Sequence, residues 1–173
     1  MNNKWTYAII LAAAGIGSSA LAQEKTNYVE GAFGQLTYEE SGYSLTPTIG
    51  RLVVGGKVAD NLALEVMGAA GFGSSTVGVV TLKVNNAFGA YAKPYIKINE
   101  KVELFGRLGF TRASLTASGP GATISTSGGD VSYGIGIGVE VAENISLVAD
   151  YMSYYDKSSI SIKGWSVGAK FGF

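Results

Sequence analysis

The sequence predicts an all-β protein, an eight-stranded antiparallel transmembrane up-and-down β-barrel, and three observations support this prediction. Helix-period patterns are absent after the first 22 residues, whereas apolar and polar residues alternate with period 2 throughout. Similar turn-and-strand stretches recur as "ADNLALEVMG" (59–68), "NEKVELFGRLG" (99–109) and "AENISLVADYM" (142–152). The chain also begins with a segment typical of exported proteins.

Residues 1–22 have the three parts of a secretory signal peptide. Lys4 supplies the basic start, residues 5–16 form a short apolar core, and Ala20-Leu21-Ala22 fits a small-residue cleavage site. An uncleaved membrane anchor is the alternative, but the core is shorter than the roughly 20 residues of a spanning helix. We therefore expect cleavage after Ala22, which leaves 173 − 22 = 151 residues (23–173) as one barrel domain.

The composition excludes several partners and chemistries. The chain has 13 basic and 13 acidic residues and no cysteine or histidine, and only 15% of its residues are charged, against a usual share of about 25%. A chain of balanced charge gives no electrostatic basis for nucleic-acid binding. Without histidine and cysteine it lacks the commonest general base, metal ligand and thiol nucleophile. We expect no cofactor, no metal and no nucleic-acid partner.

The period-2 segments define eight strands in order, at 28–38, 47–58, 62–72, 80–93, 102–112, 131–141, 145–155 and 160–173. Short polar turns at 59–61, 99–101 and 142–144 alternate with longer connections at 39–46, 73–79, 113–130 and 155–159. Strands of about ten residues with short turns at one end and longer loops at the other are typical of a transmembrane barrel. The short turns would face the periplasm, and the loop at 113–130 would face outside.

In the strands with the clearest alternation, one face carries apolar residues and the opposite face carries mainly small residues. In the strand at 131–141, apolar residues from Val131 to Val141 alternate with Ser132, three glycines and Glu140. Glycine would make a poor soluble surface, which disfavours a soluble ligand-carrying barrel, whereas in a narrow lumen it leaves room for large side chains from across the barrel. We therefore place the apolar faces against lipid, with aromatic residues near the strand ends at Phe72, Phe110, Tyr133, Trp165, Phe171 and Phe173.

Three stretches resemble the small outer-membrane β-barrel proteins that include OmpX and the membrane domain of OmpA. They are "DNLALEV" with Glu65, "AYAKPYIKINEKVELFGRLGF", and the terminal "GAKFGF" that ends on Phe173. The resemblance covers 23–173 and implies location in the outer membrane, contact with its lipid, and a monomer. It also implies that the outer-membrane assembly machinery reads the terminal strand, where the signal would be Trp165, Val167, Ala169, Phe171 and Phe173.

Strand parity places ten charged residues in the lumen. The predicted charge network consists of Glu65, Glu103, Arg107, Asp150, Arg51 and Glu140; Glu30, Lys57, Lys93 and Lys170 share the same faces. The three lysines could instead solvate the turns. Glu65, Arg107 and Asp150 lie too deep in their strands for that, so we expect Arg107 to sit among Glu65, Glu103 and Asp150. Five acids against five bases would neutralise and fill the lumen.

No motif indicates catalysis. The glycines of "YGIGIGVE" (133–140) have period 2 within one strand, so they cannot form the strand–turn–helix cradle of a nucleotide site. We expect a non-enzymatic protein with a structural or surface-interaction role. A cell-surface partner would contact the connections at 113–130 and 39–46, because loops on a rigid scaffold carry recognition. The alternative function is a narrow channel for small solutes.

Overall fold

The computed structural model describes residues 26–40, 43–157 and 160–173. The predicted signal peptide (1–22), with Ala20 and Ala22, lies outside the described residues. No helix in the described ranges is long and apolar enough to cross a membrane. The described strands are β1 (Asn27–Glu40), β2 (Tyr43–Leu45), β3 (Thr48–Ala59), β4 (Leu62–Gly71), β5 (Ser74–Val77), β6 (Val80–Lys97), β7 (Val102–Gly119), β8 (Ala122–Ala142), β9 (Ile145–Lys157) and β10 (Ile160–Gly172).

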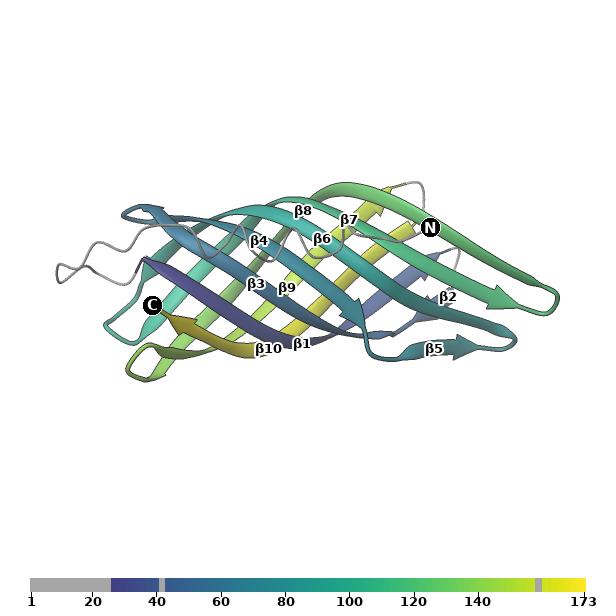
Figure 1. Cartoon of the computed structure of the whole chain (residues 1–173), viewed down its shortest axis with the longest axis horizontal. Helices are drawn as coiled ribbons and strands as arrows, with labels where there is room; N and C mark the ends of the chain where they lie inside the picture. The colour runs from purple at the N-terminus through teal and green to yellow at the C-terminus, as the bar shows by residue number, and fades with distance from the viewer. Residues whose placement is uncertain (1–25, 41–42, 158–159) are drawn as a thin grey trace, which may run out of the picture.

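Eight long strands form a closed antiparallel ring. Neighbours follow the order β1, β3, β4, β6, β7, β8, β9 and β10, and β10 then pairs with β1 from Tyr28↔Gly172 to Glu40↔Ile160. Each long strand tilts across the barrel (Figure 1). β2 and β5 are short additions that pair with β1 and β6. The ring confirms the predicted eight-stranded up-and-down barrel.

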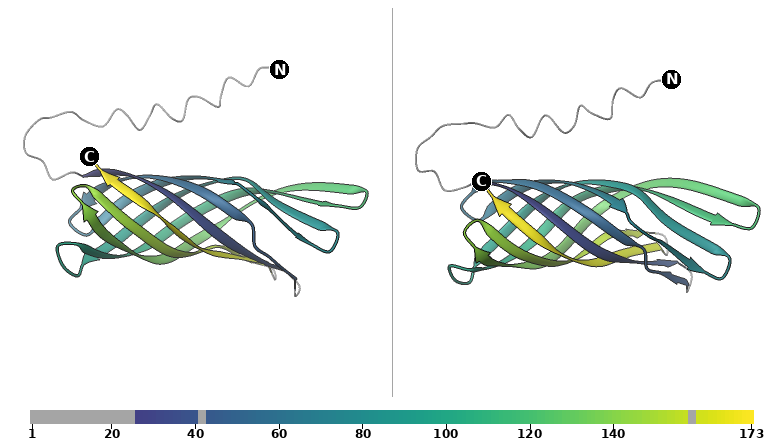
Figure 2. Two further views of the ribbon diagram at one scale, coloured as in Figure 1. Left: turned by 90° about the horizontal axis from the view of Figure 1, so that it is seen from below. Right: turned by 60° about the horizontal axis from the view of Figure 1, so that its bottom comes forward.

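The two ends of the barrel differ in length and shape. Short turns at 60–61, 98–101 and 143–144 lie at one end together with the C-terminus, and we call this the turn end. Asn144 adopts a left-handed conformation there, with φ of 66°, which asparagine tolerates better than most residues. The longer strands project at the opposite end, which we call the hairpin end (Figure 2).

The prediction of loops at 113–130 and 39–46 was largely wrong. β7 and β8 pair continuously up to Gly119↔Ala122, so most of 113–130 is a β-ribbon. Its turn is Pro120–Gly121, and the φ of 79° at Gly121 suits the second central position of a type II turn. Residues 39–46 likewise hold the end of β1 and all of β2. Both segments lack apolar alternation because strands beyond the lipid need no apolar outer face.

The two faces of the wall divide as strand parity predicts. Outward side chains are apolar and exposed; Leu64, Leu108 and Ile135, for example, are 54%, 58% and 74% exposed. Inward positions hold the buried residues, and lumen glycines make room for rings. A Cβ built on Gly136 would lie 2.3 Å from the Phe105 ring, which reaches over it from β7.

We predict opposite results for two Gly→Ala changes on neighbouring strands. Gly136→Ala should destabilise the barrel by about 1–3 kcal/mol, because the new methyl collides with Phe105 and with backbone of β9. Gly106→Ala, on the outward face where the nearest atoms lie 3.7 Å from a new Cβ, should be neutral or slightly stabilising. Urea unfolding in lipid vesicles, followed by the fluorescence of Trp165, measures both. Equal effects of the two changes would contradict the inward packing of Phe105.

Candidate functional site: the lumen

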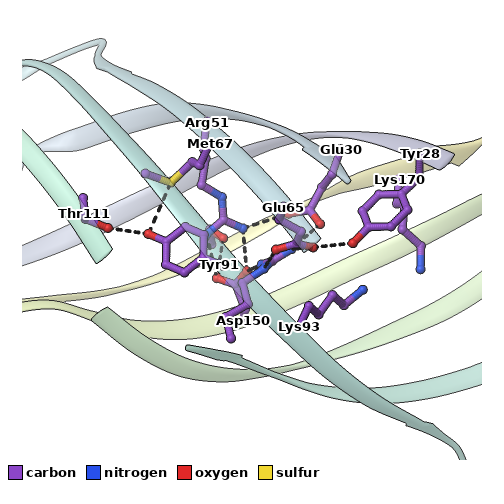
Figure 3. A network of polar contacts seen from close by, with 12 residues as sticks. Tyr28, Glu30, Arg51, Glu65, Met67, Tyr91, Lys93, Thr111, Asp150 and Lys170 are labelled. Carbon is purple, nitrogen blue, oxygen red and sulfur yellow. Dashed lines mark hydrogen bonds and ion pairs between the residues drawn. The ribbon is translucent and has the colours of Figure 1, made fainter. Parts of the chain in front are cut away.

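Five charged side chains from five strands meet in the middle of the lumen. Glu30 of β1, Arg51 of β3, Glu65 of β4, Arg107 of β7 and Asp150 of β9 form this central cluster. Their side chains are at most 2% exposed. Figure 3 shows Glu30, Arg51, Glu65 and Asp150 converging from different walls of the barrel.

Arg107 binds all three carboxylates of the central cluster. Its Nε and Nη2 donate to both oxygens of Glu65, at 2.6 and 3.2 Å. Nη2 also donates to Glu30 Oε2 at 2.6 Å, and Nη1 donates to Asp150 Oδ2. β7 neighbours neither β4, β1 nor β9, so each contact crosses the lumen. The planar fork of a guanidinium suits this task, since its five N–H donors diverge in one plane.

Arg51 joins two of the same carboxylates from the opposite side. Its Nη2 donates to Glu30 Oε1 at 2.8 Å and to Asp150 Oδ2 at 2.5 Å. Its Nη1 donates to Asp150 Oδ1 at 3.2 Å and to the Tyr154 hydroxyl at 3.1 Å. Glu30 and Asp150 therefore each bridge the two arginines, whereas Glu65 binds only Arg107 of the two. The cluster ties β1, β3, β4, β7 and β9 into one unit.

Neutral donors complete the central cluster, which carries one surplus negative charge. The Tyr28 hydroxyl donates to Glu65 Oε1 at 2.6 Å, and Ser166 Oγ donates to Asp150 Oδ1 at 2.7 Å. Arg51 Nε is the one buried side-chain nitrogen or oxygen, in the part of the chain described, that lacks a partner. Nearly every buried polar atom is satisfied, as a stable interior requires.

A second group, the lysine cluster, lies nearer the turn end. Lys93 Nζ and Lys170 Nζ bind Glu103 Oε1 at 2.8 and 3.2 Å. Lys93 is 1% exposed, and its ammonium also lies 4.3 Å from the ring centre of Phe105 and 5.1 Å from that of Tyr28. The lysine cluster has a net charge of +1, so it balances the surplus negative charge of the central cluster.

Cavities occupy the two ends of the lumen, and the central cluster lies between them. The turn-end cavity measures about 280 Å³ and has a polar lining that includes Lys57, Lys101 and Glu140. The hairpin-end cavity measures about 180 Å³ and is mainly apolar. They share no lining residue, and no member of the central cluster lines either one. The charged centre is therefore a filled layer that separates two end cavities.

The structure brings together four of the six residues predicted for the charge network: Glu65, Arg107, Asp150 and Arg51. Glu103 does not contact Arg107. The two are four residues apart on one strand, which separates them by about 13 Å, and Glu103 pairs with lysines instead. Glu140 is exposed at the turn end and makes none of the described ion pairs. Both corrections follow from distance along the barrel axis, which strand parity does not supply.

Glu30 was expected to face the lumen but was left out of the predicted network, although it contacts both arginines. The sequence signal that places Glu30 in the lumen is its alternation with the outward residues Val29, Gly31 and Phe33. Gly31 weakens this period-2 pattern because it has no apolar side chain. Lys93 and Lys170 face the lumen as strand parity predicts, and the alternative that they only solvate the turns is wrong for these two, because both bind Glu103. Trp165, Val167, Ala169, Phe171 and Phe173 all face outward.

Metal ligands are scarce in the part of the chain that the structure describes. No group of three potential metal ligands occurs there, and the whole chain lacks histidine and cysteine. The buried carboxylates and guanidinium groups bind one another and do not face an open cleft.

Family comparison agrees with the geometry. The model of the outer membrane protein beta-barrel domain matches residues 8–173. The chain belongs to this family, and it is an integral β-barrel protein of the outer membrane whose apolar outer face contacts lipid. The attachment invasion locus protein of Yersinia enterocolitica is 34% identical over 80 residues, which cover 46% of this chain and 44% of that protein. The match therefore spans less than half of that relative's length.

Solved barrels of the same fold cover most of the chain. The attachment invasion locus protein Ail of Yersinia pestis superposes with a TM-score of 0.66 at 21% identity, over 87% of this chain and all of that one. Neisserial surface protein A gives 0.68 at 15% identity, over 85% and 97%. The N-terminal barrel domain of Pseudomonas aeruginosa OprF gives 0.66 at 14% identity, over 87% and 100%. These likenesses support the fold.

We predict that Arg107→Ala destabilises the barrel by about 3–5 kcal/mol, because it leaves the buried Glu65 without an arginine partner and leaves Arg51 alone to bind Glu30 and Asp150. Adding Glu65→Gln should restore much of the loss, since it removes the carboxylate that Arg107 binds through two nitrogens. Unfolding midpoints in urea measure both steps.

Glu103→Gln is the matched control for this rescue. It removes the same charge from the same lumen, but its carboxylate binds lysines and not Arg107. Rescue by Glu103→Gln equal to that by Glu65→Gln would show that net charge matters and that the specific contacts do not.

Proposed function

We propose that this protein is a non-enzymatic surface-interaction barrel whose lumen is closed and whose hairpin end faces outside the cell. The orientation follows the general rule that outer-membrane barrels have short periplasmic turns and longer extracellular segments. The observation that carries the interaction role is a free strand edge at the hairpin end. On this view the mature chain is 23–173 and acts as a monomer, because a closed ring leaves no edge within the lipid to pair.

The free edge belongs to β8. β7 pairs with β8 from Val102↔Val139 to Gly119↔Ala122. β9 pairs with β8 only from Tyr133 onward. In the described part of the chain, residues 122–132 of β8 therefore have a strand neighbour on one side only. Residues 122–128 are exposed. An exposed strand edge presents unpaired N–H and C=O groups that an extended segment of another protein can join.

Asp130 lies where the pairing between β8 and β9 ends. Its Oδ2 accepts the backbone N–H of Asp156 at 3.2 Å, and its Oδ1 binds Lys157 Nζ at 2.6 Å. The Lys157 ammonium, aided by two backbone N–H groups, lowers the pKa of Asp130. The carboxylate thus stays charged at neutral pH and occupies a backbone donor that further pairing would use. Beyond it, β8 continues without β9.

Charge at the hairpin end disfavours a polyanionic partner. Ail of Yersinia pestis has been crystallised with the heparin analogue sucrose octasulfate. Here the basic side chains at this end, Lys83, Arg112, Lys157 and Lys163, are matched in number by the acidic Glu39, Glu40, Asp130 and Asp156. Apart from Leu115, Pro120 and Ile124, the ribbon at 113–129 consists of small and hydroxyl-bearing residues. A protein segment that adds to the β8 edge fits this neutral surface better than a sulfated glycan.

A narrow solute channel is the second candidate, and the central cluster argues against it. Five buried charges bound to one another fill the lumen between the two end cavities. A permeant ion would have to displace hydrogen bonds from both arginines. The absence of histidine and cysteine also disfavours catalysis in this lumen.

We predict that Thr123→Lys with Ser125→Lys weakens attachment of bacteria that display the chain to protein-coated surfaces by about tenfold, because lysine on an edge blocks strand addition. The control is Thr116→Lys with Ser118→Lys. These residues pair directly with Ser125 and Thr123, but on β7, which β6 and β8 flank on both sides. Equal attachment by the edge variant and this control would overturn the edge proposal.

The outward residues of β10, together with Phe173 directly after it, are proposed as the signal that the outer-membrane assembly machinery reads. Phe173 donates its backbone N–H to Asn27 O at 2.9 Å and accepts from Asn27 N at 3.3 Å, so it pairs with the start of β1. Its side chain is 54% exposed on the lipid-facing side.

We predict that Phe173→Ala lowers assembly in cells at least fivefold but reduces stability after refolding in detergent by only about 2 kcal/mol, the worth of the lost lipid contact. Phe110→Ala is the control, because this outward phenylalanine on β7 is 52% exposed and makes a similar contact with lipid. Surface accumulation and urea midpoints should be measured for both. Parallel losses for the two variants would leave only a packing role for Phe173.

A further inference from the structure

The hairpin end of the lumen contains an apolar cavity that neither the central cluster nor the free edge explains. Its floor and walls are formed by buried side chains that include Leu36, Ile49 and Met67. Thr126, Ser127 and Gly128 line its rim and are exposed, so the cavity opens at the hairpin end. A lumen that had only to be filled would carry larger side chains than Ala69, Ala87 and Ala113 here.

The lining contains no charged side chain. Its polar side chains all carry hydroxyl groups, and two of them, Thr111 and Tyr154, lie at the inner end. Thr111 Oγ1 is hydrogen-bonded to the Tyr91 hydroxyl. The Tyr154 hydroxyl accepts a hydrogen bond from Arg51 at 3.1 Å, which leaves its own proton available as a donor. Because Arg51 is held in the central cluster, Tyr154 is a fixed donor at the closed end of an apolar site.

Size and chemistry together define the ligand. The cavity volume is about 180 Å³. Protein cavities of about 150 Å³ with aliphatic and aromatic linings stay dry and bind a single benzene ring. An uncharged lining above a buried ion cluster favours a neutral molecule, since a charged one would lose its hydration without gaining a counter-charge. A carbonyl oxygen on the ligand would accept the proton of Tyr154.

We propose that the hairpin-end cavity binds a small neutral molecule that combines one apolar ring or short alkyl chain with an acceptor oxygen directed at Tyr154. The ligand enters from the hairpin end and cannot pass further, because the central cluster closes the lumen beneath it. The cavity rim shares Thr126, Ser127 and Gly128 with the free β8 edge, but the buried lining and Tyr154 lie on other strands, so a failure of the surface-interaction proposal leaves this site untouched.

Methionine-methyl NMR of the barrel in lipid nanodiscs tests the site directly. The described residues contain two methionines: Met67 lines the cavity, and Met152 lies in the buried cluster but not in the cavity lining. Titration with acetophenone should shift the Met67 signal saturably and leave that of Met152 nearly unchanged. Non-saturable drift of both signals, as from probe dissolved in the lipid, would overturn the proposal. Contacts between Met67 and lipid acyl protons would also overturn it, because the occupant would then be a lipid tail.

Two neighbouring alanines provide matched variants. Ala69→Leu places extra volume in the cavity and should weaken acetophenone binding roughly tenfold, whereas Ala70→Leu adds the same atoms on the exposed outer face. Tyr154→Phe should weaken acetophenone roughly fivefold but leave ethylbenzene, which has no acceptor, unchanged. Equal affinities across Ala69→Leu, Ala70→Leu and the native barrel would place the probe elsewhere. Equal losses for acetophenone and ethylbenzene in Tyr154→Phe would refute the proposed donor.

Discussion

The pairing of β10 with β1 is the constraint on which the rest of the molecule depends. Hydrocarbon offers no hydrogen-bond partners, so every backbone N–H and C=O within it must be satisfied by the chain itself. Thirteen residue pairs from Tyr28↔Gly172 to Glu40↔Ile160 join the first and last long strands and leave no open edge around the ring. A ring of only eight strands encloses a lumen that side chains can fill.

Filling that lumen with charge creates an electrostatic problem, which pairing across the barrel resolves. Three buried carboxylates would be unstable without counter-charges, and two buried guanidinium groups likewise. Arg51 and Arg107 approach from different walls and share Glu30 and Asp150, so each of these four charges has more than one partner of opposite charge. The lysine cluster supplies the remaining positive charge. The same contacts that neutralise the centre separate a polar cavity from an apolar one.

Much of the fold could be predicted from sequence because strand parity determines which face each residue occupies. It correctly gave the outward faces around Leu64 and Ile135 and the inward positions of Glu65, Arg107 and Asp150. Strand parity does not give the position of a residue along the barrel axis, which depends on the tilt and register of the strands. Glu103 was therefore grouped with Arg107, although it lies one layer nearer the turn end. The ribbon of β7 and β8 was missed for another reason: beyond lipid it needs no apolar face, so "LTASGPGATIST" resembles a loop. The apolar cavity depends on side chains from many strands, which no local pattern brings together.

The central claim, that the buried ion cluster closes the lumen, is tested most directly by conductance in planar lipid bilayers. Insertion should first be verified by the protection of the barrel from protease, so that a barrel that has failed to insert is not mistaken for one that is closed to ions. The native barrel should then show no stable open level across a wide range of voltage. A steady ohmic conductance that rises with salt concentration would mean that ions pass between Arg51, Arg107 and their carboxylates, and it would contradict the closed lumen.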